Sequence, residues 1–189
     1  KKKTLIIDMD PQANASQIFS SITDTDHSIY TLLSLSIKNE NIKTDIKTTV
    51  KETYLDNLYI LPANVLLSSA EIELVNVHGR ETVLKRLLKS HHDFFSQFEF
   101  ILIDCQPSLG LLTINSIIAA EHLMVPLHAD VFSVTGLSLL CETIEKLQKV
   151  FEINTTLCGF FFTQVNRQES LFKESFDYQI NLIFTLSIN

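Results

Sequence analysis

The feature that most constrains this chain is a short apolar segment near its start, which carries two carboxylates and then breaks at a proline. The segment Thr4–Asp8 is followed by Met9, Asp10 and Pro11. Side chains alternate along a strand, so Asp8 and Asp10 are expected on one side, and Pro11 cannot continue a hydrogen-bonded ladder. Chain and carboxylates should therefore leave together at the carboxyl edge of a sheet, where open α/β sheets bind their ligands.

A second apolar strand candidate, Phe98–Asp104, ends in the same way, because Asp104 is followed by Cys105, Gln106 and Pro107. A single acid after a strand is often a turn former or a helix N-cap, and this is the alternative for each aspartate. Two strands in one chain that both end in an aspartate shortly before a proline favour a phosphate-binding site over a purely structural role. In phosphoryl transfer one aspartate at a strand end supports magnesium, while another polar group orients the attacking water.

Composition limits the class of protein. The chain has 189 residues, 46% of them hydrophobic, so we predict a single domain with one core over residues 1–189. The net charge of −7 gives no general electrostatic support for a nonspecific grip on nucleic acid. Three widely spaced cysteines favour a reducing cytoplasm over a disulfide framework, and no stretch has the length of a membrane span. A cytoplasmic protein is expected.

Short apolar strands and amphipathic helices alternate along the chain. The strand candidates are Thr4–Asp8, Leu58–Leu61, Phe98–Asp104, His122–Leu127, Leu157–Thr163 and Leu182–Leu186. The helix candidates are Ser69–Val77, Thr82–Lys89, Leu111–Ala120 and Leu137–Val150, and the polar stretch Asn39–Asp56 is expected to be a loop with a short helix. This alternation predicts an α/β fold, with a mostly parallel central sheet and helices on both faces.

Several motifs, taken in order, resemble one family. They are Leu5–Ser16, Leu61–Asn64, Ala70–Leu74, Gly79–Glu81, Ile101–Asn115, Val125–Pro126, Gly136–Ser138 and Phe162–Thr163. This series resembles the ParA/Soj family of chromosome and plasmid partitioning ATPases. The family belongs to the deviant Walker-A P-loop ATPases, together with the cell-division regulator MinD and the nitrogenase iron protein, so the resemblance implies a P-loop NTPase-like fold.

The resemblance implies roles for the acids. Asp10 matches the aspartate of the family's first switch region, which positions the hydrolytic water and senses the γ-phosphate, and Asp8 beside it is a second candidate catalytic residue. Asp104 matches the Walker B aspartate, which supports magnesium through a coordinated water. The segment that follows it matches the second switch region, in which Gly110 is expected to supply backbone freedom.

The resemblance also implies cofactors and partners. The complete protein would use ATP and Mg²⁺, form an ATP-dependent homodimer, associate with nonspecific DNA of the nucleoid and respond to a ParB-like stimulator. Asn166 lies where relatives place a residue that reads the adenine edge. The alternative for Asn166 is an ordinary turn-forming role.

The chain departs from the family pattern in one important respect. No Gly-rich loop occurs in the 189 residues, although such a loop supplies the backbone amides that cradle the phosphates. We therefore expect a chain truncated at both ends and poor in ATP binding by itself. In the family the missing first strand lies beside Phe98–Asp104, so we expect this strand to have unpaired backbone groups and an uncovered flank. Two alternatives remain: a loop-less, inactive paralogue that acts as an interaction module, and a MinD-like ATPase that cycles on a membrane. Gln106 stands where a proline is usual.

Overall fold

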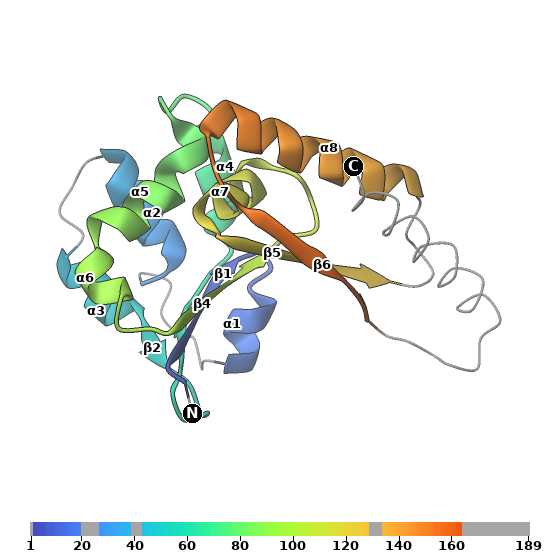
Figure 1. Ribbon diagram of the computed structural model, residues 1–189. Coiled ribbons are helices and arrows are strands. Elements are labelled where there is room, and N and C mark those ends of the chain that lie inside the picture. Colours follow the sequence, from blue (N-terminus) through green and yellow to red (C-terminus); the bar gives the residue numbers. More distant parts are fainter. Residues whose placement is uncertain (1, 20–26, 39–42, 129–133, 164–189) are drawn as a thin grey trace. The chain divides into compact units, whose positions relative to one another are not determined.

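The structure is a computed structural model that describes residues 2–19, 27–38, 43–128 and 134–163 (Figure 1). The chain divides into two compact units, Lys1–Ala120 and Glu121–Asn189, which are described separately. The single domain expected from the sequence stays a prediction. The elements in chain order are β1 (Thr4–Met9), α1 (Asn14–Phe19), α2 (Ile29–Lys38), α3 (Lys43–Thr49), β2 (Lys51–Glu52), β3 (Leu58–Leu61), α4 (Leu67–Leu74), the 3-10 helix η1 (Arg80–Thr82), α5 (Val83–Ser90), α6 (His92–Phe95), β4 (Phe100–Cys105), α7 (Leu111–Ala119), β5 (His122–His128), α8 (Val134–Phe151) and β6 (Thr156–Thr163).

The first unit is built on a four-stranded sheet with the order β2-β3-β1-β4. The first predicted strand, β1, lies inside the sheet and pairs in parallel with both β3 and β4. Only the two-residue strand β2 runs antiparallel, next to β3. The predicted α/β fold with a mostly parallel sheet is therefore confirmed, and the carboxyl ends of β1, β3 and β4 meet at one edge.

The two faces of β1 have different coverings. Leu5, Ile7 and Met9 are fully buried in the main hydrophobic core. Helices α2, α4, α5 and α7 contact one another, and α2 and α7 also contact β1, so these helices form the layer over that face. Alternation along the strand directs Asp8 to the opposite face, where Ser16 of α1 donates a hydrogen bond to it. Helix α1 lies on the other side of the sheet from α2 and α5 (Figure 1). Helices thus cover both faces of the sheet, as predicted.

Strand β4 is less well covered than β1. Phe100 is 48% exposed and Leu102 is 55% exposed, whereas the alternate residues Ile101 and Ile103 are partly buried against the core. Among the described strands, β4 is paired only with β1. The face of β4 that carries Phe100, Leu102 and Asp104 is therefore an apolar surface in contact with solvent.

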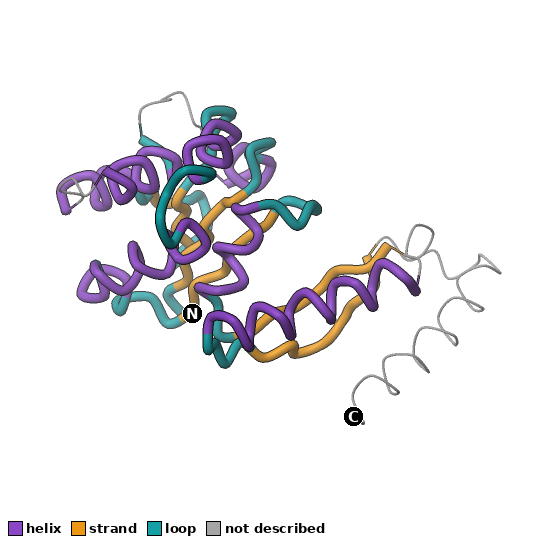
Figure 2. Tube along the Cα trace, turned by 90° about the horizontal axis from the view of Figure 1, so that it is seen from above, coloured by secondary structure: helices purple, strands orange, loops and turns teal. Residues whose placement is uncertain are grey.

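The second unit contains a parallel pair of strands and one long helix. Strands β5 and β6 pair with a register irregularity between Leu123 and Met124, and α8 runs alongside them (Figure 2). Leu137, Ile144 and Leu147 form a buried stripe on α8, which confirms the apolar face expected there. Within the described ranges, no helix has both the length and the apolar character needed to cross a membrane.

The predicted elements agree with the structure except at their ends, in three helices and in the two-residue strand β2. Helices α1 and α6 were not predicted as helices because they have six residues or fewer. Helix α2 was missed although Ser28, a residue type typical of helix N-caps, comes directly before its apolar run. The strand expected at Phe98–Asp104 begins at Phe100, since Phe98 closes a turn back to Phe95. The polar stretch contains α3 and β2 in its described part, and the strand candidate Leu182–Leu186 lies outside the described residues.

Candidate functional site

Three carboxylates gather at the carboxyl edge of the first sheet. The parallel register pairs Asp8 of β1 directly with Asp104 of β4, and Asp10 follows one residue after β1 ends. Asp104 as a whole is exposed, yet its carboxyl group carries a desolvation cost that raises its pKa, and the charges of Asp8 and Asp10 raise this pKa further. The structure therefore brings together the three acids that the sequence singled out.

Asp8 is the buried member of this group. It is 0% exposed, and its Oδ2 accepts hydrogen bonds from the backbone N–H of Ser16 at 2.8 Å and from Ser16 Oγ at 2.6 Å. Its Oδ1 accepts from the Asp10 N–H at 3.1 Å. Ser16 Oγ in turn accepts from the Ala63 N–H at 2.8 Å, just after β3. Asp8 thus fixes the loop that carries Asp10 and ties that loop to the neighbouring strand.

Asp10 sits in a tight turn after β1. Its Oδ1 accepts from the Gln12 N–H at 2.9 Å, and its backbone oxygen accepts from the Ala13 N–H at 2.8 Å. This is the turn-forming role weighed as the alternative for a strand-end acid. Ala13 adopts a left-handed conformation with φ 56°, which is costly for a residue with a Cβ atom. Strained backbone of this kind is common at functional loops.

The loop after β4 is held by side chains from two helices. Thr113 Oγ1 of α7 donates to the Ser108 carbonyl oxygen at 2.6 Å. Glu71 of α4 accepts from Gln106 Nε2 at 3.1 Å. Gly110 has φ −78° and ψ −178°, which any residue adopts, so the expected need for backbone freedom there is wrong. Gly110 provides space instead, because a methyl group at this position would overlap Glu71 Oε1.

The acids fit one half of a nucleotide site. Carboxylate oxygens suit Mg²⁺, which commonly keeps several waters and is held by one or two carboxylates together with substrate phosphates. Within the part of the chain that the structure describes, no three His, Cys, Asp or Glu side chains are arranged to hold a metal ion directly. Asp10 and Asp104 therefore fit the magnesium and water side of such a site, whereas a Gly-rich phosphate loop is absent from the 189 residues.

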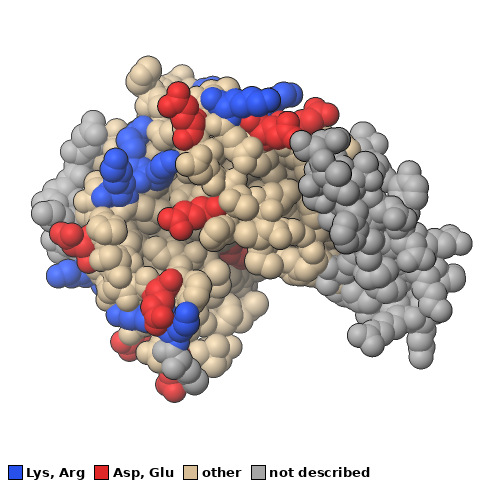
Figure 3. All heavy atoms as spheres, in the orientation of Figure 1, with Lys and Arg blue, Asp and Glu red and all other residues tan. Residues whose placement is uncertain are grey.

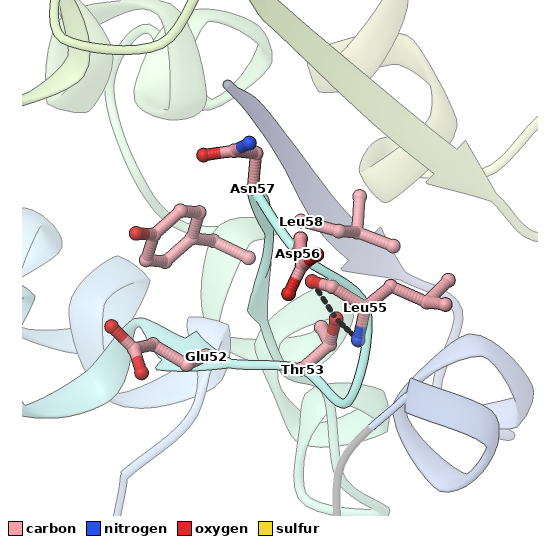
Figure 4. Close-up of a pocket in the computed structure, with 7 residues that line it drawn as sticks. Glu52, Thr53, Leu55, Asp56, Asn57 and Leu58 are labelled. Atoms are coloured by element: carbon pink, nitrogen blue, oxygen red, sulfur yellow. Dashed lines mark hydrogen bonds between the residues drawn. The ribbon is translucent and has the colours of Figure 1, made fainter. Parts of the chain in front are cut away.

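A polar pocket lies elsewhere in the same unit. It is formed by the turn that joins β2 to β3, between Glu52 and Tyr59, where Thr53 Oγ1 bonds to Leu55 (Figure 4). The Thr4 N–H donates to the Asn57 carbonyl oxygen at 2.9 Å, which places this turn at the amino ends of β1 and β3. Because the three acids lie at the opposite edge of the sheet, this pocket is separate from the candidate site.

Sequence reasoning placed some site residues and missed others. Asn166 lies outside the described residues. Ser16 was missed because its partner, Asp8, is eight positions earlier and the contact depends on how α1 docks. Glu71 lies in one of the motifs that carried the resemblance, but nothing in that motif indicates a contact with the loop after β4.

Comparison with solved structures supports the fold. Cobyrinic acid a,c-diamide synthase from Mycobacterium smegmatis, solved with a bound ATP analog and magnesium, has a TM-score of 0.81 and 26% identity, and the match covers 95% of this chain and 70% of that one. A plasmid partition protein from Borrelia burgdorferi has a TM-score of 0.75 and 23% identity over 94% of this chain and 72% of that chain, which shows a shared fold.

Comparison with curated proteins gives the family. Residues 1–158 match the model of a family described as an AAA domain. The chromosome-partitioning ATPase Soj of Treponema pallidum (strain Nichols) is 36% identical over 173 residues, and the sporulation initiation inhibitor protein Soj of Bacillus subtilis (strain 168) is 33% identical over 171 residues. These matches cover 92% and 90% of this chain, and the chain spans 64% of the length of each relative. Because of these matches, and because aspartates follow or end the strands at its site, we conclude that the chain belongs to the ParA/Soj family of P-loop ATPases.

Proposed function

We propose that the intact protein is a ParA-like ATPase that partitions plasmid or chromosomal DNA, and that the acids after β1 and β4 form the magnesium and water side of its nucleotide site. One observation carries this proposal: the register that pairs Asp8 with Asp104 also brings Asp10 beside Asp104 at the ligand-binding edge of the sheet. The names of the Soj relatives and the ATP analog and magnesium in the Mycobacterium smegmatis structure support it.

Each acid has a separate task in this proposal. Asp104 would hold Mg²⁺ through an intervening water, and the like charges that raise its pKa would be offset by a cation placed there. Asp10 orients the attacking water, because the turn after β1 presents it at the same edge. Asp8 acts on the position of Asp10 and does not contact the substrate, since its carboxylate is buried and bonded. Bound magnesium supplies the positive charge that offsets negative charge on the phosphate oxygens.

The proposal extends to partners that the family implies. They are a second copy of the chain, nonspecific DNA and a ParB-like stimulator, in a cytoplasmic, nucleoid-associated setting. The face shown in Figure 3 carries basic and acidic side chains intermingled, and the chain has a net charge of −7. DNA association therefore depends on a local basic patch and should weaken steeply as salt rises.

Separate measurements of nucleotide affinity and turnover test the roles of the acids in the intact protein. Asp10→Ala should lower turnover about a hundredfold or more while ATP affinity is kept, because a water-positioning group acts mainly in the transition state. Asp104→Ala should weaken magnesium-dependent binding. Asp93→Ala is the control, since Asp93 is exposed in α6 at the other edge of the sheet. An equal loss of affinity in both site variants would show that the roles are misassigned.

Two further titrations test the limits of the proposal. The 189-residue chain alone should bind ATP weakly by calorimetry, because several charge-assisted hydrogen bonds of a phosphate loop, each worth about 1.5–3 kcal/mol, are missing from it. Tight, magnesium-dependent binding would contradict this.

In the intact protein, Asn166→Ala should weaken the binding of ATP more than the binding of GTP if Asn166 reads the adenine edge. Equal effects on both nucleotides would leave Asn166 with its turn-forming role.

A further inference from the structure

We infer that Glu71 of α4 is a positioning residue for the loop between Asp104 and α7, an inference that rests on the proposed ATPase function. Glu71 Oε1 accepts a hydrogen bond from Gln106 Nε2 at 3.1 Å and makes a longer contact with the Leu112 N–H at 3.5 Å. Gln106 is the first residue after β4, and Leu112 lies in the first turn of α7. One carboxylate therefore holds both ends of this loop.

The first turn of α7 has a physical reason to attract a carboxylate. The first N–H groups of a helix have no partner within the helix, and the helix dipole favours negative charge at this end. No side chain at the N-cap position Gly110 supplies that partner. Glu71 reaches the first turn of α7 from a different helix, α4, so this contact sets the position of α7 relative to α4.

Two residues of the loop are adapted to Glu71. A Cβ atom at Gly110 would overlap Glu71 Oε1 and lie 3.3 Å from Gln106 Nε2, so the absence of a side chain lets the carboxylate approach. Gln106, which stands where a proline is usual in the family, donates from its side-chain amide, and proline has no such group. The residue that differs from the family pattern, Gln106, is thus bonded to Glu71 in this chain.

The consequence concerns Asp104. Asp104 lies two residues before Gln106, at the exposed end of β4. Pro107, Ser108 and Leu109 are exposed. Thr113 Oγ1 holds the middle of the loop through the Ser108 carbonyl oxygen at 2.6 Å, but on the side of Asp104 it makes only a longer contact of 3.5 Å with the Gln106 carbonyl oxygen. Loss of Glu71 would therefore release the loop on the side of Asp104 and change the direction of its carboxylate.

The same helix offers a matched control. Glu73 lies two positions further along α4, is also part-buried and also accepts a side-chain hydrogen bond, from Tyr30 Oη at 2.7 Å. Tyr30 belongs to α2, not to the loop after β4. Glu71→Ala and Glu73→Ala therefore remove similar groups from one helix, and only the first removes support from the loop.

Amide hydrogen exchange on the intact protein tests the structural part without nucleotide. In Glu71→Ala, exchange of residues 106–112 should rise about tenfold or more, as expected for loss of a charge-assisted hydrogen bond. Glu73→Ala should leave that segment unchanged, and Glu71→Gln, which keeps an acceptor oxygen, should retain most of the protection. Unchanged exchange in Glu71→Ala, or an equal rise in Glu73→Ala, would overturn the inference.

Kinetics tests the functional part. Glu71→Ala should weaken magnesium-dependent ATP binding and lower kcat, each by up to about tenfold and each less than Asp104→Ala does, because a displaced Asp104 holds Mg²⁺ less well and disturbs the reacting geometry. Glu71→Gln should recover most of kcat. Loosening of the loop with unchanged kcat would overturn the positioning role. If the unaltered intact protein hydrolyses no ATP, the proposed function fails, and the exchange result then decides whether Glu71 positions the loop.

Discussion

Asp8 Oδ2 and Ser16 Oγ are joined by a buried hydrogen bond of 2.6 Å that connects the end of β1 to the first turns of α1. The same hydroxyl accepts from the Ala63 N–H, so three segments of the first unit meet at one serine side chain. This arrangement holds the turn that presents Asp10. It explains why an acid in an apolar strand can be completely buried, since a buried carboxylate must be fully hydrogen-bonded.

Replacement of Ser16 by alanine tests this connection. Ser16→Ala removes one donor to Asp8 and leaves the Ala63 N–H without its acceptor, so the free energy of unfolding should fall by about 1–3 kcal/mol. Urea denaturation measures it. Ser68→Ala is the control, because Ser68 donates its hydroxyl proton to a backbone oxygen at an exposed position of α4. Equal losses in the two variants would argue against a special role for Ser16.

Replacement of Ala13 by glycine should stabilise the chain. The left-handed conformation of Ala13 costs an L-residue about 1–2 kcal/mol, and glycine avoids most of that cost while losing somewhat more chain entropy. Glycine also gives up the buried methyl group of Ala13, worth up to about 0.8 kcal/mol, so the expected net gain is small, below about 0.5 kcal/mol in the same denaturation assay. Ala15→Gly, two residues later in α1, should instead destabilise by up to about 1 kcal/mol. The same sign in both variants would contradict the strain at Ala13.

The carboxyl group of Asp104 gives a pH dependence whose sign can be worked out. Its pKa is raised in the folded chain by desolvation and by the charges of Asp8 and Asp10, so the folded state binds the proton more tightly than the unfolded state. The free energy of unfolding contributed by this group is therefore greatest at low pH and is lost as pH rises through the folded-state pKa.

Asp104→Asn removes the charge, and at pH 7 it should stabilise the chain by less than about 1 kcal/mol, because water screens a partly exposed group. The difference from the unaltered chain should shrink as pH is lowered towards the unfolded pKa. Denaturation curves across a pH series measure both effects. A variant less stable than the unaltered chain at pH 7 would show that repulsion among the three acids is not the dominant effect.

The exposed face of β4 should promote association of the 189-residue chain. Leu102 is 55% exposed on a strand with one described neighbour, and such apolar edges favour pairing with other chains. Leu102→Thr, which keeps a strand-forming residue, should raise the concentration at which the chain associates by about tenfold. Size-exclusion chromatography at several concentrations measures this. Val150→Thr, at an exposed apolar position of helix α8, should have a smaller effect because a helix offers no unpaired strand edge. Unchanged association in Leu102→Thr would place the contact elsewhere.

The sequence by itself determined the fold class and the location of the acids. The direction of Asp8 and Asp104 follows from the local sequence, because alternate side chains of a strand point to one face. The proline that follows shortly after each aspartate ends the strand. Burial of Leu5 and Ile7, and of the stripe on α8, follows from the same local periodicity. The ordered motifs also identified the family that the comparisons confirm.

The tertiary structure alone decided what several of these residues do. Asp8 became a buried acceptor for Ser16 because α1 docks on that face of the sheet. Glu71 reaches Gln106, 35 positions later, because α4 and α7 pack together. Gly110 is required for space and not for its backbone conformation. Periodicity specifies which face of an element is buried, but a contact between two polar side chains depends on strand register and helix docking, which arise only when the whole core is assembled.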